Sequence, residues 1–214
     1  PINFSVPTGN FGDVYAGYLA KKIGLPINKF IVATNQNDIL HRAITNGSYS
    51  VENVLETISP SMDIQIASNF ERLIFDLNDH SDKKTINAMK SINEKGKYEI
   101  HKESLEKINY DFLSSRMDEN EILKIIKTVY EKFDKVLDPH SAIGYGAFDK
   151  VNLKGNNIVL ATAHPCKFPD AIKKAINIKA ELPSELGFIL NEKENYDIID
   201  NNLNKIKQHI KERI

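Results

Sequence analysis

The sequence predicts an α/β protein with a parallel sheet, on three observations. Two short, wholly apolar runs, at residues 30–33 and 158–161, have the composition of strands that are buried on both faces, as parallel strands are. Strand-like and helix-like patterns alternate over residues 2–46, which is typical of α/β proteins. The 214 residues are 41% hydrophobic and 27% charged, and a globular chain of this size can bury a sizeable core.

Charge and cysteine content argue against several functional classes. The 28 Lys and Arg residues nearly balance 29 Asp and Glu residues, for a formal net charge of -1, which argues against nucleic-acid binding through bulk electrostatics. No apolar run approaches the roughly 18 residues that a membrane helix needs. The single cysteine, Cys166, excludes an internal disulfide and fits a reducing cytoplasm. We therefore expect a cytoplasmic protein whose partners include neither nucleic acid nor membrane.

The first 46 residues predict two strand–helix pairs. Apolar and polar residues alternate over residues 2–6, which indicates a short strand. A glycine-rich turn at residues 7–13 follows, and an apolar face over residues 14–23 predicts a helix. The apolar run at residues 30–33 predicts the second strand, and we expect the next helix at about residues 37–45.

The middle of the chain differs from its start. Residues 69–135 show weak strand signals and mainly helical periodicity, so we expect a mostly helical insertion beside the sheet. The α/β pattern returns with the strand at residues 158–161 and a helix at about residues 170–178. We expect residues 1–180 to form one lobe and residues 181–214 a helical tail packed on it. Apolar residues at heptad-like spacing mark that tail: Tyr196, Ile199, Leu203, Ile206 and Ile210.

Local patterns predict where some helices begin and where they pack closely. Residues 68–71, Ser-Asn-Phe-Glu, have the pattern of a capping box. Asp138 is expected to be an N-cap with Pro139 at the first helical position, and Gly144 and Gly146 to be close-packing positions. The six histidines show no metal-ligand spacing, so no metal site is expected.

The glycine-rich turn is the most informative segment. A strand that enters such a turn before a helix can bind an anion, because the first helical N–H groups have no internal partner. Gly9 and Gly12 can take positive φ and have no Cβ to obstruct a phosphate. No Walker lysine follows, and the dinucleotide pattern is absent. Asp13, as an N-cap, would compete for the same amides. The pattern alone fits an ordinary strand-to-helix turn equally well.

Five segments in order resemble threonine synthases, which depend on pyridoxal phosphate. They lie at residues 5–26 (SVPTGNFGDVYAGYLAKKIGLP), 32–49 (VATNQNDILHRAITNGSY), 59–75 (SPSMDIQIASNFERLIF), 137–145 (LDPHSAIGY) and 161–171 (ATAHPCKFPDA). The resemblance implies the tryptophan synthase β-like fold, also called fold type II, with residues 1–180 as the cofactor-binding lobe. It also implies conversion of O-phospho-L-homoserine and water to L-threonine and phosphate, the last step of threonine biosynthesis.

The same resemblance implies which residues bind the cofactor. The turn formed by Gly9, Asn10, Phe11, Gly12 and Asp13 corresponds to the loop that grips the cofactor phosphate. Thr162 corresponds to a hydroxyl residue beside the pyridine nitrogen, where a neutral group leaves that nitrogen largely unprotonated. On the residues alone, the favoured interpretation of Thr162 is a strand-end threonine that bonds to nearby backbone.

The chain itself is expected to contain no catalytic residue. The resemblance implies a Schiff-base lysine upstream of the glycine-rich turn, and residues 1–6 contain no lysine. We therefore expect the C-terminal portion of a threonine synthase, truncated at its N-terminus, without the N-terminal lobe and inactive alone. Two alternatives stay open: another fold type II enzyme, such as a serine or threonine dehydratase, or a non-catalytic α/β module that binds a phosphorylated metabolite.

Overall fold

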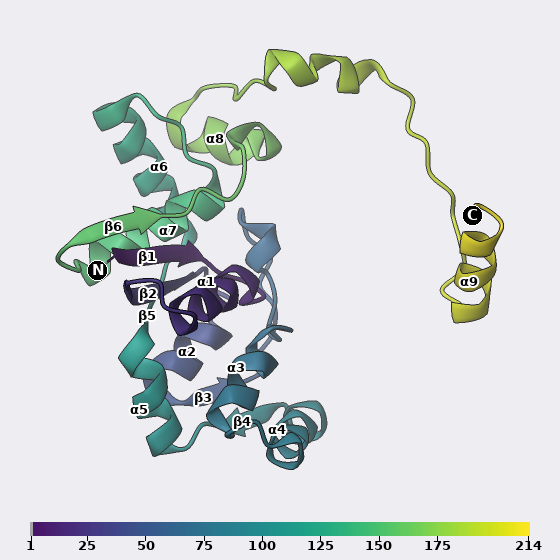
Figure 1. Ribbon diagram of the computed structural model, residues 1–214. Helices are drawn as coiled ribbons and strands as arrows, with labels where there is room; N and C mark the ends of the chain where they lie inside the picture. Colours follow the sequence, from purple (N-terminus) through teal and green to yellow (C-terminus); the bar gives the residue numbers. More distant parts are fainter. Residues whose placement is uncertain (1) are drawn as a thin grey trace. The chain divides into compact units, whose positions relative to one another are not determined.

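A computed structural model describes residues 2–214 (Figure 1). The chain divides into two compact units between Glu181 and Leu182, and each unit is described by itself.

The first unit contains a four-stranded sheet in the order β5-β2-β1-β6, in which every neighbouring pair is parallel. The strands are β1 (Ile2–Pro7), β2 (Ile27–Thr34), β5 (Phe112–Arg116) and β6 (Asn156–Val159). This confirms the predicted α/β class with a parallel sheet. Because the strands point the same way, their carboxyl ends meet at one edge, which is where open α/β sheets bind ligands. We call it the carboxyl edge.

Helices cover both faces of this sheet, which explains why β2 is apolar from Phe30 to Ala33. Phe30 and Val32 belong to one core cluster, and Ile31 and Ala33 to the other, as the alternation of side chains along a strand requires. The first cluster includes residues of α1 (Gly12–Lys22), α2 (Ile39–Asn46), α3 (Phe70–Leu77), α4 (Asp82–Lys95) and α5 (Lys102–Asp111). The second includes residues of α6 (Glu119–Phe133), α7 (Pro139–Val151) and α8 (Pro169–Ile176). Figure 1 shows these two groups of helices on opposite sides of the strands.

Residues 69–135 are mostly helical, but our expectation missed two strands there. β4 (Lys97–Glu99) pairs antiparallel with β3 (Ser48–Ser50) in a separate two-stranded sheet. β5 is an edge strand of the main sheet, so the segment is not a single insertion beside it. The strand signal is weak because β5 carries Ser114 and Ser115, and the Ser114 hydroxyl donates to the Val32 carbonyl oxygen at 2.7 Å.

The predicted capping box at residues 68–71 is wrong. α3 has Asn69 at its N-cap without a side-chain cap. Ser68 instead turns to the glycine-rich turn, where its N–H and hydroxyl each lie 3.4 Å from Asn10 Oδ1. A capping box does occur at α6, where Asp118 and Glu121 bond reciprocally to each other's backbone N–H groups.

The predicted start of α7 is confirmed. Asp138 is its N-cap, Pro139 is the first helical residue, and the Asp138 side chain accepts from the N–H groups of His140 and Ser141. Close packing at its glycines is confirmed too. A Cβ on Gly144 would lie 2.9 Å from Pro7 Cγ, and one on Gly146 would overlap the Met117 sulfur.

The second unit, residues 182–214, contains the 3-10 segment η3 (Ser184–Asn191) and the helix α9 (Leu203–Lys211). Asn202 caps α9 by accepting from the N–H groups of Asn204 and Lys205. Of the predicted apolar stripe, Leu203, Ile206 and Ile210 lie on α9, while Tyr196 and Ile199 precede it outside any helix. That this tail packs on the lobe stays a prediction. Among residues 2–214, each helix is either too short or too polar to cross a membrane.

Candidate functional site

The glycine-rich turn leads from the carboxyl end of β1 into α1. β1 ends at Pro7 and α1 begins at Gly12. The Thr8 N–H donates to the Ala33 carbonyl oxygen at 2.8 Å, so the turn leaves the sheet tied to the neighbouring strand β2. A concavity of about 200 Å³ lies in the turn and is lined by residues 7–14. Sites for whole drug-sized ligands measure roughly 300–1,000 Å³, so this volume suits one small group of a ligand.

Positive φ in this turn occurs at Phe11, with φ of 65°, whereas Gly9 and Gly12, which could adopt it, do not. A left-handed non-glycine residue costs about 1–2 kcal/mol, and here aromatic packing offsets that cost. The Phe11 ring is buried edge-to-face against Phe70 at 5.2 Å between centroids, and lies 5.7 Å from Phe112. This conformation sends the side chain into the core and leaves the following backbone at the surface.

The amides that follow Phe11 are available to a ligand. The Tyr15 N–H donates to the Phe11 carbonyl oxygen at 3.0 Å, so the N–H groups of Gly12, Asp13 and Val14 are the ones that an α-helix leaves without an internal partner. Within the described part of the chain, no side chain caps this end of α1. Asp13 is exposed in the first turn and does not cap these amides, so it does not compete with a ligand for them.

The two glycines of the turn are explained by a neighbouring segment. A Cβ on Gly9 would lie 2.7 Å from the Ser61 carbonyl oxygen, and one on Gly12 would lie 3.3 Å from Asn69 Nδ2. The Asn69 N–H also donates to the Asn10 carbonyl oxygen at 3.1 Å. Ser61 and Asn69 therefore support the turn from outside, and the absent Cβ atoms allow that close approach.

Thr162 leaves the sheet next to this turn. β6 ends at Val159, two residues earlier than expected, but the Leu160 N–H still donates to the Ser5 carbonyl oxygen at 3.0 Å. Since β6 pairs with β1, the segment that carries Thr162 follows the strand adjacent to the one that enters the turn. Thr162 is exposed, and its N–H donates to Ser141 Oγ at 3.0 Å.

A buried polar cluster at the amino end of α7 lies behind both segments. Asp138 Oδ1 accepts from the His140 N–H at 2.9 Å and lies 3.1 Å from His140 Nδ1, while Oδ2 accepts from the Ser141 hydroxyl. Burial alone would raise the pKa of Asp138, but the hydrogen bonds from His140 and Ser141 outweigh it and hold that pKa below its ordinary value. Asp138 is therefore ionised at neutral pH.

Sequence reasoning missed a second polar cluster at the same edge. Asn35 and Asn37, which follow β2, donate from Nδ2 to Asp63 Oδ1 at 2.8 and 2.9 Å. The Thr57 N–H donates to Asp63 Oδ2 at 2.7 Å. These bonds fix the irregular chain before Asp63 against the sheet. The run Thr-Asn-Gln-Asn-Asp directly after an apolar strand was a signal that could have found them.

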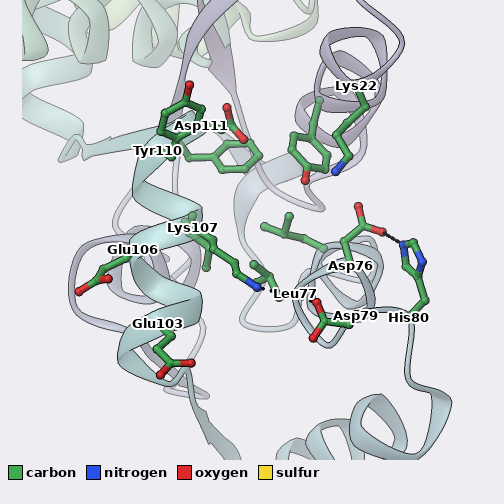
Figure 2. Close-up of a pocket in the computed structure, with 14 residues that line it drawn as sticks. Lys22, Asp76, Leu77, Asp79, His80, Glu103, Glu106, Lys107, Tyr110 and Asp111 are labelled. Carbon is green, nitrogen blue, oxygen red and sulfur yellow. Dashed lines mark hydrogen bonds and ion pairs between the residues drawn. The ribbon is translucent and has the colours of Figure 1, made fainter.

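A larger groove lies elsewhere, between α1, α3, α5 and the first residue of β5 (Figure 2). Its volume is about 910 Å³, and its lining carries many charged side chains. Figure 2 shows Lys107 Nζ directed at Asp79, at 3.8 Å from Oδ1, and His80 Nε2 at 3.1 Å from Asp76 Oδ1. Because β5 begins here, the groove is at the opposite end of the sheet from the turn. No predicted site residue lines it.

A family model, curated relatives and solved structures that are similar to this chain all point to threonine synthases. A family model described as "Threonine synthase, C-terminal" matches residues 141–210. The threonine synthase of Pseudomonas aeruginosa is 38% identical over 98% of this chain and 45% of its own length. That of Saccharomyces cerevisiae is 40% identical over 82% of this chain and 38% of its own length.

The chain resembles the C-terminal portion of threonine synthases. Two solved structures show the same fold. One is a PLP-bound threonine synthase from Brucella melitensis, with a TM-score of 0.91 and 41% identity over 99% of this chain and 46% of that chain. The other is threonine synthase from yeast, with a TM-score of 0.86 and 37% identity over 99% of this chain and 47% of that chain. The predicted resemblance is confirmed, and this chain spans less than half the length of these relatives.

Proposed function

We propose that this chain is the C-terminal portion of an enzyme that converts O-phospho-L-homoserine and water to L-threonine and phosphate with pyridoxal phosphate as cofactor. The observation that carries the proposal is the turn at residues 9–13, whose free amides lie at the carboxyl edge one strand away from Thr162. Support comes from the similarity to threonine synthases over nearly the whole chain.

The residues of the turn fit the phosphate of this cofactor. The concavity of about 200 Å³ is lined by residues 7–14, and the N–H groups at the start of α1 add the positive end of the helix dipole. Gly9, Asn10, Phe11, Gly12 and Asp13 would hold the phosphate through the backbone. The charge of Asp13 opposes a dianion only weakly, because the exposed side chain is solvated.

Thr162 would bind the pyridine nitrogen. When bound, the cofactor would supply an electron-withdrawing ring that makes the substrate protons near the amine acidic. A hydroxyl at this nitrogen is neutral, so it accepts or donates a hydrogen bond without forcing protonation of the ring. Ser141 accepts the backbone N–H of Thr162 at 3.0 Å, which fixes the backbone that carries this exposed hydroxyl.

The remaining chemistry is proposed to lie outside this chain. Among residues 1–6, before the turn, there is no lysine to bind the cofactor covalently. We propose that an N-terminal lobe of the same fold type II enzyme supplies that lysine and part of the substrate site, in the cytoplasm. The 214-residue chain alone is then expected to be inactive and to bind pyridoxal phosphate weakly at most.

The proposal is tested on the full-length protein that contains this chain, incubated with O-phospho-L-homoserine. We expect equimolar threonine and inorganic phosphate, and a near-ultraviolet or visible absorbance band from bound cofactor. Deamination of serine or threonine supplied in a parallel assay, with no phosphate released from O-phospho-L-homoserine, would identify a dehydratase instead. Absence of any cofactor band after addition of pyridoxal phosphate would contradict the proposal and favour a non-catalytic module.

A further inference from the structure

The amino end of α7 contacts the segment that carries Thr162 directly, and the turn at residues 9–13 through Ser61. Ser141 Oγ accepts the Thr162 N–H at 3.0 Å, and His140 Nε2 accepts the Ser61 N–H at 3.3 Å. Ser61 in turn lies against Gly9, since a Cβ there would approach the Ser61 carbonyl oxygen to 2.7 Å. Two adjacent side chains of one helix are therefore connected to Thr162, by Ser141 directly, and to the turn, by His140 through Ser61.

Asp138 fixes the role that each of these side chains plays. Its buried, ionised carboxylate only accepts, so the single hydroxyl proton of Ser141 goes to Oδ2 and the oxygen lone pairs are left for the Thr162 N–H. For the same reason the His140 proton is assigned to Nδ1, facing Oδ1, and Nε2 keeps the lone pair that accepts from Ser61.

α7 is a rigid support for this cluster. Gly144 packs directly on Pro7, the last residue of β1, and its carbonyl oxygen accepts from the Ser5 hydroxyl at 2.6 Å. The side chains of Asp138 and His140 are 0% and 5% exposed, so little room is left for other rotamers. Thr162, by contrast, is exposed and lies beyond the end of β6.

We propose that Ser141 and His140, oriented by Asp138, are positioning residues that set the separation between Thr162 and the turn at residues 9–13. This inference rests on the proposed function, because the two ends of one cofactor would bind at those two places. A rigid ligand held at both ends binds tightly only when its two contacts are correctly spaced. The cluster touches no ligand itself and acts through backbone N–H groups.

Ser141 provides the most direct test, in the full-length protein reconstituted with pyridoxal phosphate. Ser141→Ala should weaken cofactor affinity about five- to tenfold, as expected for loss of one buried hydrogen bond. It should also change the absorbance spectrum of bound cofactor in the same direction as Thr162→Val. Hydrogen exchange at the Thr162 amide should accelerate. Ser141→Thr, which keeps the hydroxyl, should restore affinity and spectrum.

A matched control is Ser114→Ala, which removes a partly buried hydroxyl from the same sheet, at β5. It should leave the affinity and the spectrum unchanged. The double variant Ser141→Ala/Thr162→Val should be no worse than its poorer parent, because Ser141 acts through Thr162. His140→Phe, which keeps a ring but loses the acceptor, should weaken phosphate-end binding, and His140→Gln should recover part of it.

A Ser141→Ala protein that unfolds at a lower temperature yet binds pyridoxal phosphate with unchanged affinity and spectrum would overturn the positioning role. The cluster would then only cap α7. Failure of the proposed function has a different signature, in which the unmodified protein itself binds no cofactor, and that result would overturn both. Should Ser141→Ala not fold, unchanged affinity and spectrum in His140→Phe would count against the proposal in the same way.

Discussion

At the carboxyl edge of the sheet, polar side chains are buried and bonded to one another or to backbone, whereas at the opposite end the groove between α1, α3 and α5 is lined by charged side chains that water reaches. Asp138 at the carboxyl edge is 0% exposed at its side chain, and Asp79 in the groove is 77% exposed. A buried carboxylate needs partners in fixed places, while a solvated one does not. The groove is larger, yet the carboxyl edge is the end with preorganised geometry.

The site that we propose has the smaller volume of the two concavities, so the proposal does not rest on volume. The groove measures about 910 Å³ and the concavity of the turn about 200 Å³. Ion pairs in the groove, such as Lys107 with Asp79 at 3.8 Å, join exposed side chains, so water screens their attraction. The turn instead presents backbone N–H groups that cannot move away, which suits recognition of a defined phosphate.

The largest effect is expected from removing the carboxylate at the centre of the buried cluster. Asp138→Ala leaves the His140 and Ser141 side chains and the first N–H groups of α7 without an acceptor. We expect a loss of about 3 kcal/mol in unfolding free energy, from charged hydrogen bonds and a lost N-cap. Urea denaturation of the full-length protein measures it. Asp138→Asn, which keeps one acceptor oxygen, should lose clearly less unfolding free energy. Equal losses in the two variants would show that the retained acceptor oxygen contributes nothing to stability.

A smaller effect is expected from filling the space beside the turn. Gly9→Ala places a Cβ 2.7 Å from the Ser61 carbonyl oxygen, which is backbone and cannot rotate away. We expect a loss of about 2 kcal/mol in stability, typical of overpacking, together with weaker binding of pyridoxal phosphate. Gly187→Ala is the control, since its Cβ would meet nothing within 4 Å. A stable Gly9→Ala protein with normal cofactor affinity would show that the turn tolerates displacement.

The acid dependence of stability tests two buried carboxylates at the carboxyl edge, Asp138 and Asp38. Burial alone would raise the pKa of both carboxylates. Hydrogen bonds from His140 and Ser141 outweigh burial at Asp138 and hold its pKa below the ordinary value. Hydrogen bonds from Arg42 and Arg116, with the charges of these arginines, do the same for the pKa of Asp38. A lowered pKa in the folded state stabilises the protein above the unfolded pKa of about 4, and that stability is lost as pH falls through the folded pKa. The midpoint temperature of thermal unfolding, measured from pH 6 downward, should therefore decrease once the pH drops under about 4. The decrease should be less steep in Asp138→Asn.

The smallest effect is expected in the groove. Asp79→Asn removes the charge that faces Lys107, and asparagine tolerates the positive φ of 53° at this position. We expect a change below about 0.5 kcal/mol in unfolding free energy and no change in cofactor affinity. Thermal unfolding and reconstitution with pyridoxal phosphate measure both. A marked loss of cofactor affinity would mean that the groove, and not the carboxyl edge, carries the site.

Local patterns predicted the parts of the fold that local forces determine. The run at residues 30–33 is apolar because both faces of β2 are covered, and Asp138 with Pro139 starts α7 as expected. β5 was missed because its sequence, FLSSR, becomes a strand through pairing with β2 and not through its own periodicity. The capping box at residues 68–71 failed because Ser68 bonds to Asn10, 58 residues away.

In the candidate site, too, features set by neighbouring residues could be predicted, and features set by distant contacts could not. The position of the turn at residues 9–13 could be predicted, since strand, glycines and helix are adjacent in the sequence. Its conformation could not, because positive φ at Phe11 depends on a ring packed against Phe70 and Phe112. The support from Ser61 and from the amino end of α7 joins segments that are distant in sequence, and one sequence contains no record of such contacts.

The central claim is that the amides at the start of α1 bind the phosphate of the cofactor. A crystal structure of the full-length protein with pyridoxal phosphate tests it most directly. The account predicts phosphate oxygens within about 3 Å of the N–H groups of residues 9–14, with the pyridine nitrogen beside the Thr162 hydroxyl. A phosphate bound anywhere else, with that turn in contact only with water, would contradict it.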